Sequence, residues 1–222
     1  MDAFISYSNS DRKMARATKS ALEDFGIKGF LAHEDLQVSE EWRDSIIEEL
    51  KTAKIFVTLL SANFKASEWC AQEVGYIISR PDVLIIPLSL DGTVPFGFIS
   101  KLQSKRVRVA DDVPIILRDV LLKKRPRLAI PLWIKKVEEA GSYRGAEAIV
   151  APLVPHFAAF TPKEAEDFLV AALGNSQVWD AGLCRMDYLP TFARLHWTAI
   201  PKKLKKEFLD TLSLTEKKLK SA

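Results

Sequence analysis

A tryptophan and a glutamate stand four residues apart in the stretch SEWCAQEVGY, as Trp69 and Glu73. On a helix this spacing puts both side chains on the same side, one turn apart. A carboxylate can accept hydrogen bonds from hydroxyl groups and stabilise a developing positive charge, and an indole can stack on a flat ring and orient it. The two residue types therefore suit a small-molecule site, provided that the fold leaves them accessible.

The helical pattern around the pair shows where the two side chains would lie. Successive residues of a helix advance by about 100°. An apolar stripe then consists of Cys70, Val74, Ile77 and Ile78. A second face beside it carries Trp69, Glu73, Tyr76 and Arg80. The pair thus lies at the edge of the core, where it suits either a cleft wall or a solvated flank, and on this helix alone the flank is the more frequent arrangement.

Five strand-like segments are arranged around this helix, and helical patterns separate them. The strands are predicted at residues 3–7, 26–32, 53–61, 83–90 and 105–109. The helices are predicted within residues 8–26, at 42–50 with Ser39 as cap, at 67–79 with Ser67 as cap, and through Leu117 and Leu121. Strands that alternate with helices indicate a parallel, doubly wound sheet. Pro87 inside the fourth strand requires a bulge or a position without a ladder hydrogen bond.

In such a sheet, ligands bind outside the carboxyl ends of the strands. These ends fall at residues 7–10, 33–39, 61–69 and 91–98. Trp69 stands in the third of these segments, so the fold would turn Trp69 and Glu73 toward the edge where ligands bind.

The pattern changes after the basic stretch KKRPR, residues 123–127, where β-branched alternation largely ends. Helices are predicted at residues 128–139, 143–154, 163–173 and 202–220, and Thr161 with Pro162 and Glu164 forms the signature of a capped helix start. We therefore expect two domains, residues 1–124 with the α/β sheet and residues 125–222 as a small α-helical domain.

Composition narrows the class of protein. The two halves of the chain differ in net charge. Residues 1–120 carry 15 Lys and Arg against 18 Asp and Glu, whereas residues 121–222 carry 17 Lys and Arg against 11 Asp and Glu. The two cysteines and three histidines are dispersed without metal-ligand spacing, so neither a disulfide framework nor a metal site is expected. Without a signal-peptide pattern or an apolar run long enough to span a bilayer, the sequence predicts a soluble, cytoplasmic protein.

Several ordered motifs of the first half resemble a known family. DAFISYSNSD, FLAHEDLQVSEEWRDSI, AKIFVTLLSANF, SEWCAQEVGYII and VLIIPLSLDG together resemble a bacterial TIR (Toll/interleukin-1 receptor) domain over roughly residues 1–120. The resemblance implies a flavodoxin-like fold, with a parallel five-stranded sheet and helices on both faces. PFGFISKLQS also resembles a segment of stand-alone bacterial TIR proteins.

TIR domains either act as scaffolds or cleave the nicotinamide glycosidic bond of NAD+, and the enzymes use a glutamate one turn past an aromatic residue. These positions match Glu73 and Trp69. The chemistry is consistent with a single carboxylate, because nicotinamide leaves as a neutral molecule and needs no general acid, unlike the leaving group of an ordinary glycoside. NAD+ would then be the substrate, and no separate cofactor is implied.

The resemblance also implies substrate-binding residues at other strand ends. Ser6, Tyr7 and Ser8 would line the pocket, although Ser8 suits helix capping equally well. Trp42 matches an aromatic position near the ligand, with a core position as the alternative, and Leu36 belongs to the connecting loop that mediates TIR packing. Where some active relatives carry arginines after the first strand, this chain has Ser8 and Asn9, so its phosphate contacts are left open.

By resemblance to stand-alone bacterial TIR proteins, the expected role is antiphage defence of the Thoeris type. The product, ADP-ribose or a cyclic isomer, would activate a separate effector after TIR self-association. One alternative is a non-catalytic interaction module, and another is a secreted factor that binds host TIR adaptors. The basic amphipathic tail could address a membrane or nucleic acid, but packing against its own domain is more frequent, and no motif supports DNA binding.

Overall fold

The structure is a computed structural model that describes residues 2–31 and 42–221. The chain divides into two compact units, Met1–Val120 and Leu121–Ala222. Helix α5, Asp112–Lys124, spans this division, so the two units share one continuous helix. The predicted domain boundary after residue 124 coincides with the end of that helix and stays a prediction.

A five-stranded sheet forms the first unit, and all of its strand pairs are parallel. The strand order is β2-β1-β3-β4-β5. The strands are β1 Asp2–Ser6, β2 Lys28–Leu31, β3 Ile55–Leu60, β4 Leu84–Ser89 and β5 Lys105–Arg106. The flavodoxin-like fold is thereby confirmed, although β5 has only two of the five residues expected.

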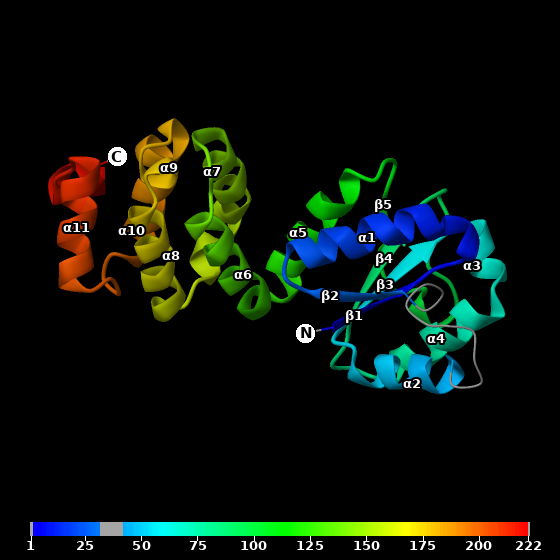
Figure 1. Ribbon diagram of the computed structural model, residues 1–222. Helices are drawn as coiled ribbons and strands as arrows, with labels where there is room; N and C mark the ends of the chain where they lie inside the picture. Colours follow the sequence, from blue (N-terminus) through cyan, green and yellow to red (C-terminus); the bar gives the residue numbers. More distant parts are fainter. Residues whose placement is uncertain (1, 32–41, 222) are drawn as a thin grey trace. The chain divides into compact units, whose positions relative to one another are not determined.

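Helices cover both faces of this sheet (Figure 1), with α1 on one face and α2 and α4 on the other. The first four α-helices of this unit are α1 Arg12–Asp24, α2 Trp42–Thr52, α3 Ala62–Ala66 and α4 Glu68–Ile78. Two short 3-10 helices are Asn9–Asp11 and Gly97–Ile99. On the face of α2 and α4, the rings of Phe4 and Phe56 stack 5.7 Å apart at the centre of a buried core. Every residue of β3 is buried, as expected of a central strand.

Pro87 is accommodated in β4 without a bulge, because the register between β3 and β4 runs unbroken through it. The amides of Leu84 and Leu90 donate to β3, to the carbonyls of Lys54 and Leu60. Since alternate residues of a strand point to opposite neighbours, the Pro87 nitrogen faces the β5 side. There β5 pairs only with Leu88 and Ser89, so the proline removes no ladder hydrogen bond.

The second unit is built from helices. Their bounds are α6 Pro126–Glu138, α7 Tyr143–Val150, α8 Pro162–Gly174, α9 Ser176–Trp179, α10 Leu189–His196, α11 Lys202–Leu212 and α12 Glu216–Ser221, with a 3-10 helix at Ala151–Ala159 and a π-helical turn at Cys184–Tyr188. The capping box at the start of α8 is confirmed: Thr161 accepts from the Glu164 amide, and the Glu164 carboxylate accepts from the Thr161 amide.

Two predictions for this unit are wrong in detail, and two of its helices were missed. The helix over residues 143–154 ends as an α-helix at Val150, because Pro152 and Pro155 lack the amides that an α-helix needs. The helix over residues 202–220 breaks at Ser213, which is left-handed (φ 56°) and lets the Leu214 amide reach the Leu209 carbonyl at 2.9 Å. Helices α9 and α10 were not predicted. Pro190 lies in the first turn of α10, where the missing amide of a proline costs no helical hydrogen bond.

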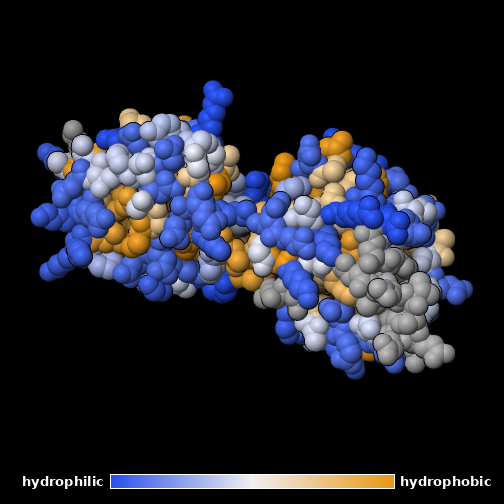
Figure 2. Space-filling view, in the orientation of Figure 1, coloured by the Kyte–Doolittle hydropathy of each residue, from blue (hydrophilic) through white to orange (hydrophobic). Residues whose placement is uncertain are grey.

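The amphipathic tail helix packs within its own unit. Leu204, Phe208 and Leu212 of α11 are buried, and α11 contacts α8. This agrees with the expectation that the helix packs on its own domain and leaves its lysines in solvent. Hydrophilic residues cover most of the visible surface of this unit, around a smaller hydrophobic area (Figure 2).

Candidate active site

Helix α4 carries the central pair, and its start is fixed by a cap. The Ser67 hydroxyl accepts a hydrogen bond from the Cys70 amide at 3.3 Å, as the sequence predicts. Cys70, Val74 and Ile77 are buried against the sheet, whereas Ile78 at the last helical position is 38% exposed. The expected apolar stripe is therefore confirmed except for Ile78.

Glu73 is buried rather than placed on a solvated flank: only 5% of it is exposed. Its carboxyl accepts a hydrogen bond from the hydroxyl of Ser6, the last residue of β1. Burial raises the pKa of Glu73 from 4.5 to about 7, against the opposing effect of the hydrogen bond from Ser6. A carboxyl with this pKa exchanges its proton near neutral pH, as groups at catalytic sites often do.

A pocket opens between α2 and α4 directly at this carboxyl. Its volume is about 190 Å³. It is lined by Ile46, Ile47, Leu50, Trp69, Gln72, Glu73 and Tyr76. Trp69 is 40% exposed on its wall, whereas Glu73 is almost fully enclosed. The volume lies below the range of about 300–1,000 Å³ typical of sites for drug-sized ligands, so the pocket accommodates a fragment such as one ring with part of a sugar.

The thiol of Cys70 belongs to the same buried group but is chemically inert. Cys70 is 1% exposed, and burial raises the pKa of its thiol to about 11. Since the thiolate is the reactive form, Cys70 contributes packing rather than a nucleophile. Among the described residues, no cluster of three or more His, Cys, Asp or Glu could hold a metal ion. The polar and aromatic groups of the pocket are thus the Glu73 carboxyl, the Gln72 amide and the rings of Trp69 and Tyr76.

Comparison of the sequence with a protein-family model identifies the family of the chain. The model of the TIR domain matches residues 3–118, which is more than half of the chain. The chain belongs to the TIR domain family. A search among curated proteins gave no match. In the part of this TIR protein that the structure describes, no helix is long and apolar enough to cross a membrane.

Two carboxylates occupy other strand ends of the TIR domain. Asp11 accepts a hydrogen bond from the Ser61 hydroxyl at 2.6 Å. Asp91 accepts from the amides of Ala62 at 2.8 Å and Thr93 at 2.9 Å, and hydrogen bonds from Thr93 and Ala62 lower its pKa to about 2. Both carboxylates are therefore held by groups of the turn that follows β3.

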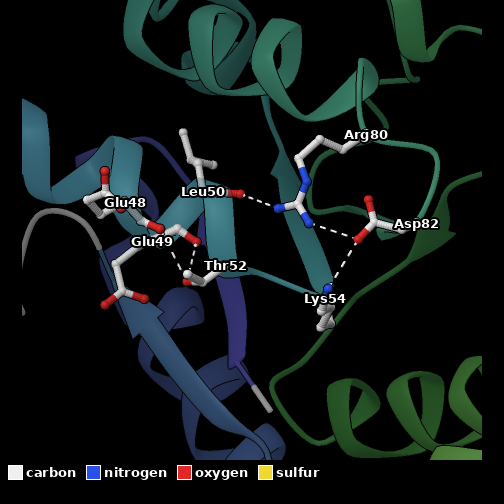
Figure 3. A network of polar contacts seen from close by, with 7 residues as sticks. All are labelled: Glu48, Glu49, Leu50, Thr52, Lys54, Arg80 and Asp82. Carbon is white, nitrogen blue, oxygen red and sulfur yellow. Dashed lines mark hydrogen bonds and ion pairs between the residues drawn. The ribbon is translucent and has the colours of Figure 1, made fainter.

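Arg80 fixes the distance between the two helices that form the pocket (Figure 3). Its guanidinium donates to the carbonyl of Leu50 in the last turn of α2 at 2.6 Å, and to Asp82 at 2.8 Å. Lys54 also pairs with Asp82, at 3.3 Å. Carbonyls in the last turn of a helix lack partners within the helix. Arg80 therefore satisfies one of them and ties α2 to the segment that follows α4 in the TIR domain.

The remaining predicted site residues are distributed as follows. Tyr7 follows β1 and is buried, with 1% exposed, and it does not line the pocket between α2 and α4. Ser8 is half-buried, and its side chain makes no capping hydrogen bond at the helix start that it precedes. Trp42 is the first residue of α2, and Leu36 lies outside the described residues. A substrate-binding role for these four residues stays a prediction.

Sequence reasoning missed parts of the pocket. Gln72 lines it beside Glu73, and Ile47 of α2 forms part of the opposite wall. Gln72 stands three residues after Trp69, so the helical spacing alone would have indicated that it shares a face with Trp69. The contribution of α2 depends on how two helices pack, and no local pattern contains this information.

Proposed function

We propose that this TIR protein cleaves the bond between nicotinamide and ribose in NAD+ and gives ADP-ribose or a cyclic isomer. The observation that supports the proposal most is the buried Glu73 carboxyl, which lies at the inner end of a pocket whose outer wall is Trp69. Membership of a family that includes such enzymes agrees with it.

A single carboxylate is sufficient for this reaction. The electron pair of the glycosidic bond moves to the pyridinium nitrogen, so nicotinamide leaves neutral and no acid has to protonate it. Positive charge develops on the ribose as the bond breaks, and an ionised Glu73 stabilises it. Water, or a nitrogen of the adenine ring in a cyclisation, then forms the new bond to the anomeric carbon. Attack by water releases a proton that Glu73 or solvent can take.

The raised pKa of Glu73 fits a substrate that carries a positive charge. At neutral pH the buried carboxyl is close to half protonated in the free protein. A bound pyridinium cation favours the ionised form and lowers the pKa, because an opposite charge nearby stabilises the carboxylate. Binding of NAD+ would thus ionise the group that the reaction needs.

The dimensions of the pocket suggest how NAD+ would lie. The nicotinamide ring and part of its ribose would lie between α2 and α4, with the ring against Trp69 and the ribose hydroxyls toward Glu73. The diphosphate and adenosine must lie outside this small pocket. The carboxylates of Asp11, after β1, and Asp91, after β4, bond to the turn after β3 and would repel a diphosphate that lay against them.

Antiphage signalling in the cytoplasm, through a separate effector activated by the product, belongs to the same proposal and is supported by resemblance alone. The helical unit would serve assembly, sensing or partner contact. Self-association of the TIR unit would complete the substrate site.

A second candidate function is a TIR scaffold without catalysis. Two apolar residues after β4 favour it, because Val94 is 68% exposed and Phe98 is 78% exposed. Exposed apolar side chains of this size suit a contact with another chain. Assembly and catalysis are compatible, so only an activity measurement separates the two functions.

The test incubates the purified full chain with NAD+, dilute and under crowding conditions that bring about self-association, and follows nicotinamide release by chromatography. Glu73→Gln removes the carboxylate but keeps the shape of the side chain. Glu68→Gln is the matched control, since Glu68 is an exposed acid on the same helix. We expect release by the wild type and Glu68→Gln but not by Glu73→Gln. No release by the assembled wild type, or equal release by Glu73→Gln, would leave the scaffold function.

A further inference from the structure

A buried hydroxyl in the middle of the sheet has no use in the reaction described so far. Thr58 of β3 is fully buried, with 0% exposed, and its Oγ1 has no hydrogen-bond partner among the described residues. Leaving a buried hydroxyl without a partner costs free energy, and valine would fill the same space in a strand without this cost. An unsatisfied buried polar group therefore requires an explanation.

The sheet register places Thr58 beside the candidate active site. Thr58 is paired with Ser6 of β1, and residues in register on neighbouring strands point to the same face. That face is covered by α4, since the Ser6 hydroxyl donates to Glu73. Both hydroxyls thus belong to the layer between the sheet and α4.

The strand order brings Thr58 close to the path of the Glu73 side chain. Helix α4 belongs to the connection from β3 to β4, and such a crossover packs over the strands that it joins. Ser6 lies on β1, on the far side of β3 from β4. A carboxyl that extends from α4 to Ser6 therefore crosses β3, where Thr58 is in register with Ser6.

We propose that Thr58 is a positioning residue for Glu73, whose hydroxyl donates a second hydrogen bond to the carboxylate once Glu73 is ionised. A neutral carboxyl is satisfied with few donors, whereas a carboxylate has two oxygens with about four acceptor sites. Ser6 supplies one donor, and a buried carboxylate needs more to persist. Thr58 would hold the ionised carboxylate over the floor of the pocket, aimed at the ribose. The inference rests on the proposed role of Glu73.

Gln72 and Trp69, the other possible donors beside Glu73, are exposed residues of the pocket wall, whereas Thr58 is buried in the layer between the sheet and α4. The walls from α2 are the apolar residues Ile46, Ile47 and Leu50, and the β4 residue in register with Thr58 is Pro87. On α4 the titratable neighbours are Cys70 and Tyr76, and the Asp11 carboxylate acts on the Cys70 thiol. Strands β1 and β3 carry two side-chain hydroxyls, those of Ser6 and Thr58. Thr58 is therefore the second hydroxyl that these strands contribute to the layer.

The experiment measures the titration of Glu73 directly in the full chain. Side-chain carboxyl carbons of glutamate are labelled with ¹³C, and the Glu73 signal is assigned by its absence in Glu73→Gln. The signal is followed from pH 4 to pH 9 in wild type, Thr58→Val and Thr58→Ser. We expect Thr58→Val to raise the pKa of Glu73 by about one unit, because it removes a donor to the charged form, and Thr58→Ser to leave it near the wild-type value. Thr58→Ala gives the same test if valine disturbs the packing.

An unchanged pKa of Glu73 in both Thr58→Val and Thr58→Ala would overturn the inference and leave Thr58 as a buried residue of the strand. A shift of equal size in Thr58→Ser would overturn it as well, since the hydroxyl would then not be responsible. Because the measurement needs no turnover, it separates a failure of this inference from a failure of the proposed NAD+ cleavage.

Discussion

Replacing Glu73 by glutamine should change how the stability of the TIR unit depends on pH. The folded pKa of Glu73 is about 7, whereas the ordinary value is 4.5. A carboxyl whose pKa is raised by folding binds its proton more tightly in the folded state. Its contribution to stability is therefore complete below pH 4.5 and is lost as the pH rises toward and through 7.

The size of the effect follows from this pKa difference. Between pH 5 and pH 8 the wild type should lose about 2–3 kcal/mol of unfolding free energy through Glu73. The glutamine variant has no proton to lose, so its stability relative to the wild type should rise by about 2–3 kcal/mol over this range. Any fixed cost of burying the amide group is the same at both pH values and cancels.

The assay is denaturation in urea with pulse-labelled amide hydrogen exchange read in peptides of β1 and β3, which reports the TIR unit without the helical unit. The matched control is Glu68→Gln, which removes an exposed carboxyl from the same helix. An equal stability difference between Glu73→Gln and wild type at pH 5 and pH 8 would refute the reasoning, because the carboxyl could not then be held protonated by burial.

Three further predictions concern the neighbours of Glu73. Trp69→Ala should lower kcat/KM for NAD+ roughly tenfold through lost stacking, while Trp69→Phe retains most of the activity in the same nicotinamide assay. Ser6→Ala should raise the pKa of Glu73 further, since it removes a hydrogen bond that lowers this pKa, and a ¹³C titration would show an unchanged or lower value if this is wrong. Arg80→Met should lower the unfolding free energy by about 1–2 kcal/mol, whereas Lys54→Met, which breaks only an exposed ion pair, should cost less than about 0.5 kcal/mol; equal losses in urea denaturation would contradict the role of Arg80.

The pattern of the sequence was sufficient to predict the sheet. Strand and helix periods alternate along the first half, and parallel strands that are joined through a helix nearly always form right-handed crossovers. The cap at Ser67 and the apolar stripe of Cys70, Val74 and Ile77 are local features, so the sequence predicted where α4 begins and which side of it is buried. The exposed Ile78 and the two-residue β5 show that element ends are decided by their surroundings.

The helical unit was harder to predict, because prolines have more than one structural outcome. Pro190 follows a π-helical turn and lies within the first turn of α10, whereas Pro152 and Pro155 convert the continuation of α7 into a 3-10 helix. Which outcome occurs depends on where the proline falls relative to the start of a helix.

The sequence by itself determined that Trp69 and Glu73 lie one turn apart on a helix at the ligand-binding edge of a parallel sheet, because helical spacing and strand alternation are local properties. The tertiary structure decided that Glu73 is buried rather than solvated, since its environment includes β1 and α2, which are distant from it in the chain. That burial places the pKa near 7 and makes the Ser6 hydroxyl a partner. Desolvation is a property of the assembled layers, and no spacing along one helix contains it.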